Sequence, residues 1–405
     1  MSEDHAKVQS ALTRLRTGWS LTALGCLIML GGGYIFLSSQ WGPSYATRWL
    51  VISSIICIYL SWSLWQGLEY NYRPGEEHLL ATFGPGNNLT ILRALMIAAV
   101  AGFLTSPRPE GLLAWIPGVL YTLATLIDLF DGYVARLTNH TTHLGGMLDI
   151  RFDGLGVLVA ALLIVQYGQV PAWYLLVALA RYIFLAGIWL RVRLGKPVHD
   201  LPPSRSRRPL AGVQMGFMAV VLWPLFSPPA TYLAATLFAI PFLVGFTRDW
   251  FLVSGVIKPT WKTREVSELS SSRFRRRARD WLPIGLRLAV VVLMAGPLIG
   301  RLLDYTNQVT RYAELGMPYP PIGLAILSLF EVCVMLLIFL GAGGRASAIV
   351  ALGLLGIHQI FAPLTPAQVT LVIFLTAIMY LGTGVYSLWT PENHLIYRRL
   401  GEQTS

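Results

Sequence analysis

The chain has 405 residues, of which 55% are hydrophobic and only 13% are charged, and its mean hydropathy is +0.58. Soluble domains carry about 25% charged residues, so this composition excludes an ordinary water-soluble enzyme and favours an integral membrane protein. The net charge of +11 comes from Lys and Arg between the apolar runs. That placement is typical of charges that orient membrane helices, and it predicts no nucleic-acid partner.

Apolar runs recur along the whole chain, and each is long enough, or nearly so, to cross a bilayer as a helix. They cover residues 18–38, 47–67, 89–106, 111–130, 145–168, 171–190, 210–227, 230–247, 284–302, 320–341, 346–362 and 367–389. We therefore expect an all-α polytopic membrane protein with about twelve transmembrane helices. The apolar run that follows Lys7, Arg14 and Arg16 lacks a convincing cleavage site, so we expect it to be a retained span.

The Lys and Arg residues favour one side of the membrane. If the N-terminus is cytoplasmic, the basic segments 191–208 and 248–282, Arg345 and the Arg398–Arg399 tail all lie inside, while loops such as 39–46 and 363–366 carry no Lys or Arg. Both termini are then cytoplasmic, and the cell (plasma) membrane is the expected location. We expect two additional N-terminal helices in 1–80, a six-helix domain in 81–247, a basic interfacial linker in 248–283 and a four-helix domain in 284–405.

Four aspartates are spaced so that they share helix faces. Asp128 and Asp131 are three residues apart, and Asp149 and Asp153 are four apart on the next predicted helix, with Gly145 one turn earlier on the same face. A polar turn at 139–143 joins the two helices, which we expect to be antiparallel neighbours. The spacing predicts that all four carboxylates converge just inside the cytoplasmic boundary of the membrane.

Carboxylates gathered at that depth repel one another and are costly to desolvate, so a positive partner is expected. Carboxylate oxygens select hard divalent cations, and four of them suit a pair of Mg²⁺ ions, with Mn²⁺ as the substitute. Such ions usually share their coordination with substrate phosphates. Gly132, Ala135 and Gly145 carry little bulk and leave room for a ligand, and the guanidinium of Arg136 suits a phosphate.

Residues 128–153 resemble the signature of the CDP-alcohol phosphotransferase (CDP-alcohol phosphatidyltransferase) family. The pattern is D-x-x-D-G-x-x-A-R, eight residues, then G-x-x-x-D-x-x-x-D, and it matches at every fixed position. The resemblance covers about 85–247, and the run from Pro85 through Asn88 and Thr90 to Arg93 is similar to the start of the family's first helix. The chain departs from that start by one extra residue near the Asn.

The resemblance implies a Mg²⁺-dependent transferase of phospholipid biosynthesis and assigns roles within the signature. Asp128, Asp131, Asp149 and Asp153 would ligate two divalent metals that grip the donor diphosphate, and Asp153 would also be the catalytic base. Asp128, Gly132, Ala135, Arg136 and Gly145 would bind the CDP moiety. The implied partners are CDP-diacylglycerol, an alcohol acceptor and membrane lipids, and the family also implies a homodimer.

The acceptor pocket is expected around Arg181 and the basic loop containing Arg205, Arg207 and Arg208. Arg181 lies in the middle of an apolar run, where it either holds an acceptor phosphate or pairs with one of the aspartates. Together these arginines favour an anionic acceptor such as glycerol 3-phosphate or inositol phosphate, although serine stays open. Transfer of a CDP-activated polar head group, a carboxylate-lined cation transporter and a scaffold role are the alternatives.

The last four predicted helices, about 284–389, resemble the DoxX-like membrane family. The residues that carry this resemblance are Gly316 to Pro320, Glu331, Gly341 to Arg345 and Gly382 to Leu388. Glu331 and His358 are ionisable groups within apolar runs, which makes them either functional or simply hydrogen-bonded to neighbouring helices. The three cysteines, Cys26, Cys57 and Cys333, have no metal-binding spacing and predict free thiols.

Overall fold

The computed structural model describes residues 2–76, 78–201, 207–226, 228, 230–257, 273–314, 319–359, 365–382, 384 and 387–388. This part of the chain is helical and contains no strand, apart from one isolated β-bridge between Tyr72 and Leu79. The all-α prediction is therefore confirmed. The chain forms two compact units, the first from residues 1–183 and 212–224 and the second from residues 184–211 and 225–398.

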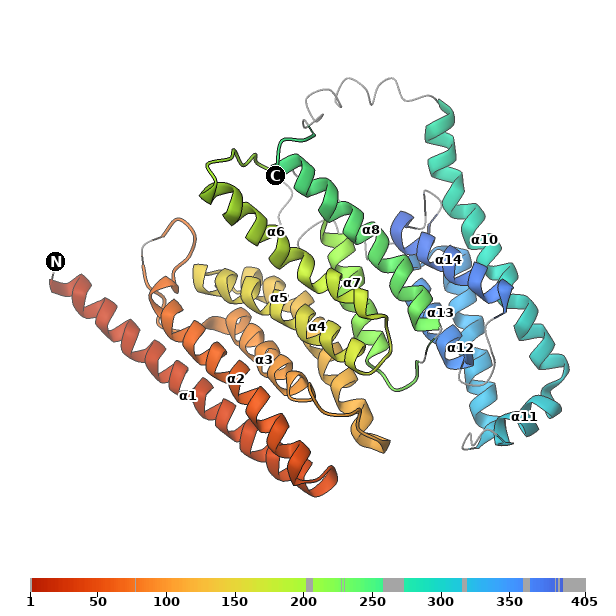
Figure 1. Ribbon diagram of the computed structural model, residues 1–405, viewed down its shortest axis with the longest axis horizontal. Coiled ribbons are helices and arrows are strands. Elements are labelled where there is room, and N and C mark those ends of the chain that lie inside the picture. The colour runs from red at the N-terminus through yellow and green to blue at the C-terminus, as the bar shows by residue number, and fades with distance from the viewer. Residues whose placement is uncertain are drawn as a thin grey trace. The chain divides into compact units, whose positions relative to one another are not determined.

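Within the described residues, each predicted apolar run overlaps a helix (Figure 1). The helices are α1 (Ser2–Gln40), α2 (Pro43–Gly67), α3 (Gly84–Ala101), α4 (Trp115–Leu137), α5 (His143–Gln166), α6 (Leu175–Arg193), α7 (Arg207–Val221), α8 (Ala230–Val253), α10 (Arg273–Leu303), α11 (Tyr305–Glu314), α12 (Pro320–Leu340), α13 (Gly344–Gln359) and α14 (Pro366–Leu381). Within the described residues, seven helical segments are long and apolar enough to span a membrane, and α7, α13 and α14 are shorter apolar helices. The predicted number of twelve spans stays a prediction.

In the first unit, α1 and α2 form an antiparallel hairpin that packs against α3, mainly through α2. The turn between α1 and α2 contains Gly42, whose φ of 103° is accessible to glycine and strained for other residues. The indole nitrogen of Trp49 and the hydroxyl of Ser53 donate to the backbone carbonyls of Ala99 and Ala98 in α3, at 2.8 and 2.9 Å. These bonds fix α2 against α3, which in turn packs on α4 and α5.

The position of α3 corrects one expectation. We expected α4 and α5 to be direct neighbours, but the main packing partner of both is α3. Small residues make this close approach possible, because Ala94 and Ala98 of α3 are completely buried. The short turn between α4 and α5 ends at Thr142, whose side chain caps α5 by accepting a hydrogen bond from the Gly145 amide at 3.1 Å.

In the second unit, α10, α12, α13 and α14 pack against one another, and α8 contacts α13 and α14. Helix α11 was not predicted, because its ten residues contain no apolar run. Helix α10 begins at Arg273, so residues 273–283 of the expected linker are continuous with the helix that follows, while residues 258–272 lie outside the described part. None of Cys26, Cys57 and Cys333 forms a disulfide.

Candidate functional site

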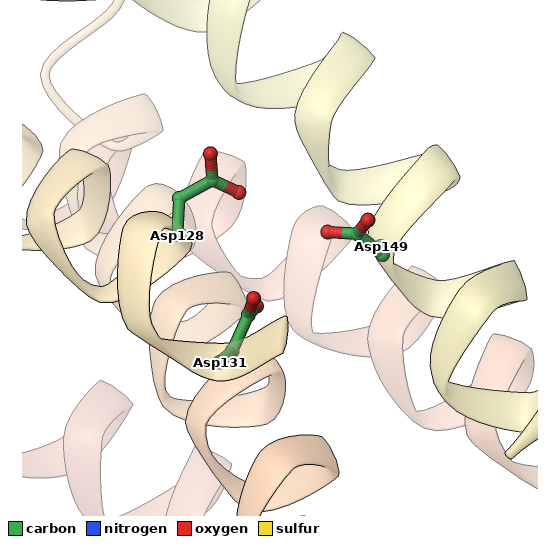
Figure 2. Close-up of side chains that lie close together, drawn as sticks. All are labelled: Asp128, Asp131 and Asp149. Carbon is green, nitrogen blue, oxygen red and sulfur yellow. The ribbon is translucent and has the colours of Figure 1, made fainter. Parts of the chain in front are cut away.

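Three of the four predicted aspartates meet in the first unit. Asp128 and Asp131 project from α4 and Asp149 projects from α5, and one carboxylate oxygen of each lies within 4.8 Å of the others. Figure 2 shows the Asp149 carboxylate directed from α5 towards the pair on α4. The convergence predicted from the i, i+3 spacing on α4 and the position of Asp149 is therefore present.

The guanidinium of Arg93, on α3, lies among all four carboxylates. We call Asp128, Asp131, Asp149 and Asp153 the carboxylate cluster. Its Nη2 lies 3.0 Å from Asp149 Oδ1 and 2.9 Å from Asp153 Oδ1, both on α5. Its Nη1 is ion-paired with Asp128 and lies 3.7 Å from Asp131 Oδ2, both on α4. Because only 2% of the Arg93 side chain is exposed, α3 contributes a buried cation to the aspartates of both neighbouring helices.

Asp131 is the most constrained member of the carboxylate cluster. Its Oδ2 accepts a hydrogen bond from the Thr90 hydroxyl at 3.0 Å, and its Oδ1 accepts one from the Gly132 amide at 2.6 Å. The side chain of Asp131 is 9% exposed, whereas that of Asp149 is 45% exposed. Within the cluster, Asp131 on α4 is therefore buried and held by two hydrogen bonds, whereas Asp149 on α5 is more accessible to solvent.

The donor set of the carboxylate cluster fits divalent cations. Four carboxylates and one guanidinium leave a surplus of three negative charges when all are ionised (4 − 1), which is costly in a partly buried site. Hard oxygen ligands that meet within a few ångströms are the environment that Mg²⁺ and Mn²⁺ prefer. Asp128, Asp131 and Asp149 satisfy this geometry together, and Asp153 lies next to them through Arg93.

Two of the small residues in the signature have a packing role. A methyl group on Gly145 would collide with the side-chain oxygen of Asn87 on α3, and Ala135 is the residue that a methyl group on Gly86 would strike at 2.6 Å. Asn87 itself donates to the Thr142 hydroxyl at 2.9 Å. Small side chains at positions 135 and 145 therefore let α3 approach α4 and α5, a packing role in addition to the predicted space for a ligand.

The other two residues predicted to bind CDP lie on the same helix as the cluster. Gly132 is next to Asp131 on α4, and a methyl group on it would lie 3.3 Å from Arg136 Nη1. The guanidinium of Arg136 therefore lies beside Gly132, directly after Asp131, near the end of α4.

The predicted acceptor residues fall into different settings. Arg181, on α6, lies beside α5, because a methyl group on Gly154 would be 3.8 Å from its Nη1, and its positive charge acts on Asp153. Arg207 instead forms a forked ion pair with Asp249, with contacts of 2.6 and 3.1 Å, within the second unit. Arg205 and the side chain of Arg208 lie outside the described residues.

No role was predicted for Arg93, although this residue ends the run from Pro85 that resembles the start of the family's first helix. An arginine in the apolar part of a predicted helix is a signal in itself, because such a charge needs a partner at membrane depth. Thr90 and Arg93 are three residues apart and share a face of α3, which is the face that meets the aspartates. That spacing was available in the sequence, but the partners were not.

Comparisons with known proteins agree with this site in a polytopic helical membrane protein. Residues 85–247 match the family model of CDP-alcohol phosphatidyltransferase, and a CDP-diacylglycerol–glycerol-3-phosphate 3-phosphatidyltransferase of Rickettsia bellii is 30% identical over 125 residues, 30% of this chain and 67% of that protein. The chain belongs to the CDP-alcohol phosphatidyltransferase family.

Two further relatives show how far the similarity extends. An enzyme with the same printed name from Cereibacter sphaeroides is 34% identical over 139 residues, which cover 33% of this chain and 61% of that protein. A Mycobacterium tuberculosis protein that carries the provisional name of a cardiolipin synthase is 26% identical over 201 residues, 48% of this chain and 91% of that protein. No solved structure is significantly similar to the chain.

Proposed function

We propose that this protein transfers the phosphatidyl group of CDP-diacylglycerol to the hydroxyl of glycerol 3-phosphate and releases CMP. The observation that carries the proposal is the carboxylate cluster, in which the aspartates of the family signature meet around Arg93. The family model matches residues 85–247, which contain the cluster, and relatives that bear the name of this activity are similar to the chain. The same cluster supports two divalent ions, with Mg²⁺ preferred and Mn²⁺ as the substitute.

Asp128, Asp131 and Asp149 would hold the metal ions, together with Asp153. When bound, the ions supply positive charge to the donor diphosphate as negative charge develops on it. Asp131 is suited to the fixed part of this site because Thr90 and Gly132 already orient both of its oxygens. The more exposed Asp149 stands at the side from which a substrate can enter.

Asp153 is proposed as the catalytic base. Its carboxylate takes the proton of the acceptor hydroxyl, and the resulting oxygen forms a bond to the phosphatidyl phosphorus while the bond between that phosphorus and the bridging oxygen of CMP breaks. The electron pair leaves with CMP. Asp153 is suited to this role because Arg93 holds it beside the other three carboxylates, while its side chain remains 35% exposed.

The end of α4 is proposed to bind the CDP moiety through Asp128, Gly132, Ala135 and Arg136, together with Gly145 of α5. Gly132 lies beside the guanidinium of Arg136, which can donate to a phosphate oxygen. Ala135 and Gly145 contribute by keeping α3, α4 and α5 close together. Their effect on nucleotide binding would therefore be partly indirect.

Arg181 is the best supported acceptor residue, because it lies on the Asp153 side of the site and can pair with an anionic acceptor. We also propose that the acceptor contacts the basic loop, because its arginines would favour an anion. These residues are Arg205, Arg207 and Arg208. A second candidate acceptor is phosphatidylglycerol, because transfer of a phosphatidyl group to it would yield cardiolipin, the lipid that the name of the mycobacterial relative contains. We further propose a homodimer in the plasma membrane, with the site on the cytoplasmic side where Lys and Arg are enriched.

The decisive experiment is CMP release by the purified protein with CDP-diacylglycerol, Mg²⁺ and separate acceptors: glycerol 3-phosphate, phosphatidylglycerol, inositol phosphate and serine. We expect turnover with glycerol 3-phosphate, and its loss in Asp153→Asn and after removal of divalent cations. Turnover with phosphatidylglycerol alone would select the second acceptor. If no acceptor gives CMP above the Asp153→Asn level, the activity is wrong, and metal-dependent binding of CDP would then separate a nucleotide site from a cation transporter.

A further inference from the structure

A small cavity lies beside the carboxylate cluster, within the first unit. Arg93 and Asp153 line it together with Tyr121 and Thr125 of α4, and the rest of its wall is apolar. Its volume is about 10 Å³, and a buried water molecule requires roughly 10–15 Å³ on this measure. The cavity therefore has room for one water molecule and is too small for a substrate group.

Tyr121 brings a buried hydroxyl to this cavity. The residue is only 2% exposed, and its hydroxyl makes no hydrogen bond within the part of the chain that the structure describes. A hydroxyl buried in this way is destabilising, and natural proteins rarely keep one unless ordered water satisfies it. Phenylalanine would fill the same space without that cost, so the hydroxyl requires a partner that the neighbouring side chains do not supply.

The other polar residues of the wall complete a set of donors and acceptors. Nε of Arg93 is buried and also has no hydrogen-bond partner among the described residues, although the Nη atoms of this arginine are ion-paired with the cluster. The Thr125 hydroxyl gives its proton to the Tyr121 carbonyl at 2.9 Å, so its oxygen can still accept. Asp153 adds a carboxylate, which only accepts when it is ionised. Tyr121 and Arg93 thus supply donors, and Thr125 and Asp153 supply acceptors.

A water molecule matches this set of partners. Buried waters make about three hydrogen bonds, with a range of about two to four. A water in this cavity would accept from the Tyr121 hydroxyl and from Arg93 Nε, and would donate to Asp153 and to Thr125. The charges of Asp153 and Arg93 both act on Tyr121, which agrees with a position of its hydroxyl near both groups.

We propose that one ordered water molecule in this cavity links Tyr121 to Asp153, and that Tyr121 is thereby a positioning residue for Asp153. Arg93 Nη2 already lies 2.9 Å from Asp153 Oδ1, and the water would hold the same carboxylate from the cavity. The side chain of Asp153 remains 35% exposed, so an acceptor can still approach it. A carboxylate held at two points keeps its orientation when it meets the acceptor hydroxyl. The positioning role rests on the proposed function, whereas the water link does not.

Two measurements on the purified full-length protein test the link and the role separately. A structure at a resolution that shows ordered water should place one molecule within hydrogen-bond distance of Tyr121 Oη and of the Asp153 carboxylate. CMP release with CDP-diacylglycerol, Mg²⁺ and glycerol 3-phosphate should show that Tyr121→Phe lowers kcat about tenfold, because a hydrogen bond that leads to the charged base is lost. The KM of either substrate should change by less than about twofold, because Tyr121 contacts neither.

Tyr167→Phe is the matched control. The Tyr167 hydroxyl is also buried without a hydrogen-bond partner among the described residues, but it follows α5 at the far end from Asp149 and does not line the cavity. This variant should keep the kcat of the unaltered protein. A merely structural role of the Tyr121 hydroxyl would instead lower the melting temperature and leave the kcat of the folded enzyme unchanged.

The possible failures are distinguishable. A well-resolved cavity without ordered water would overturn the link. An unchanged kcat in Tyr121→Phe, a change in KM alone, or an equal loss of kcat in Tyr167→Phe would overturn the positioning role. If the unaltered protein releases no CMP with any acceptor, the proposed function fails and the positioning role fails with it, while the structure still decides the water link.

Discussion

The two units of this protein each bury an arginine among ionisable partners, but the balance of charge differs. In the first unit, Arg93 meets four carboxylates, and the small cavity beside it has a volume of only about 10 Å³. In the second unit, Arg301 meets one carboxylate and a histidine beside a cavity of about 180 Å³. The first site has surplus negative charge and little empty volume, whereas the Arg301–Glu331 pair of the second site is balanced and borders a larger cavity.

The two buried groups differ in how far their charges compensate one another. Four carboxylates on one arginine are under-compensated, so the first site has a reason to attract cations, and through them phosphates. A single Arg–Glu pair is already balanced, so the second site draws attention through its cavity and its further polar groups. The first unit is therefore distinguished by its uncompensated negative charge, and the second by the volume of the cavity beside a balanced pair.

The largest expected effect tests whether the first site works through cations. Asp149→Asn should lower CMP release by about a thousandfold, because it removes both a metal ligand and charge that the bound ions balance. Turnover measured against Mg²⁺ concentration checks this, and circular dichroism checks that the helices persist. Asp304→Asn, an exposed aspartate of the second unit, is the control and should retain full activity. Normal turnover in Asp149→Asn would remove the cation role of the first site.

Replacing each buried arginine separately tests whether the two charge groups differ in their affinity for cations. Arg93→Gln and Arg301→Gln each leave a buried carboxylate without its cation, and each should cost about 3–5 kcal/mol of stability without added metal. Mg²⁺ should restore much of the thermal stability of Arg93→Gln, since it can bind the four carboxylates. It should not restore Arg301→Gln, which has only Glu331. Equal responses of the two variants to Mg²⁺, in melting experiments, would contradict the assignment of the cation site to the first unit.

Substitution of the proposed acceptor arginines should have a smaller effect, on the KM for glycerol 3-phosphate. Arg181→Gln should raise KM for glycerol 3-phosphate about tenfold, because a charge-assisted hydrogen bond to the acceptor is lost beside Asp153. Arg207→Gln should change KM by less than about threefold and stability by less than about 1 kcal/mol, since Arg207 is already paired with Asp249 at a partly exposed site. Steady-state kinetics separates the two. A larger KM effect at Arg207 would place the acceptor contact in the basic loop.

The smallest expected effect concerns the packing that holds the first site together. Gly145→Ala should cost about 1–3 kcal/mol, because its methyl group collides with Asn87 of α3. Asn87→Ala should cost about 1 kcal/mol through the lost hydrogen bond to Thr142. The double variant should be more stable than the sum of the two single effects predicts, because the smaller side chain makes room for the methyl group. Strict additivity in denaturant unfolding would show that residues 87 and 145 do not meet.

Local spacing explains which parts of the molecule could be predicted. Long apolar runs gave the helices, since a membrane helix satisfies its own backbone whatever surrounds it. The i, i+3 and i, i+4 spacings predicted that Asp128 and Asp131, and Asp149 and Asp153, share faces. Helix α11 was not predicted because it is short and polar. The packing of α4 and α5 on α3 was not predicted because chain order does not fix which helices pack together.

The sequence by itself determined the helical membrane architecture and the four aspartates of the first site, because both follow from periodicity within single helices. Only the tertiary structure decided what faces those aspartates: Arg93 comes from another helix, more than thirty positions earlier than Asp128. It also brought Arg301, Glu331 and His358, which share no local pattern, to one cavity. Contacts between helices depend on side-chain packing and charge compensation across the bundle, and neither is encoded in the spacing of any one segment.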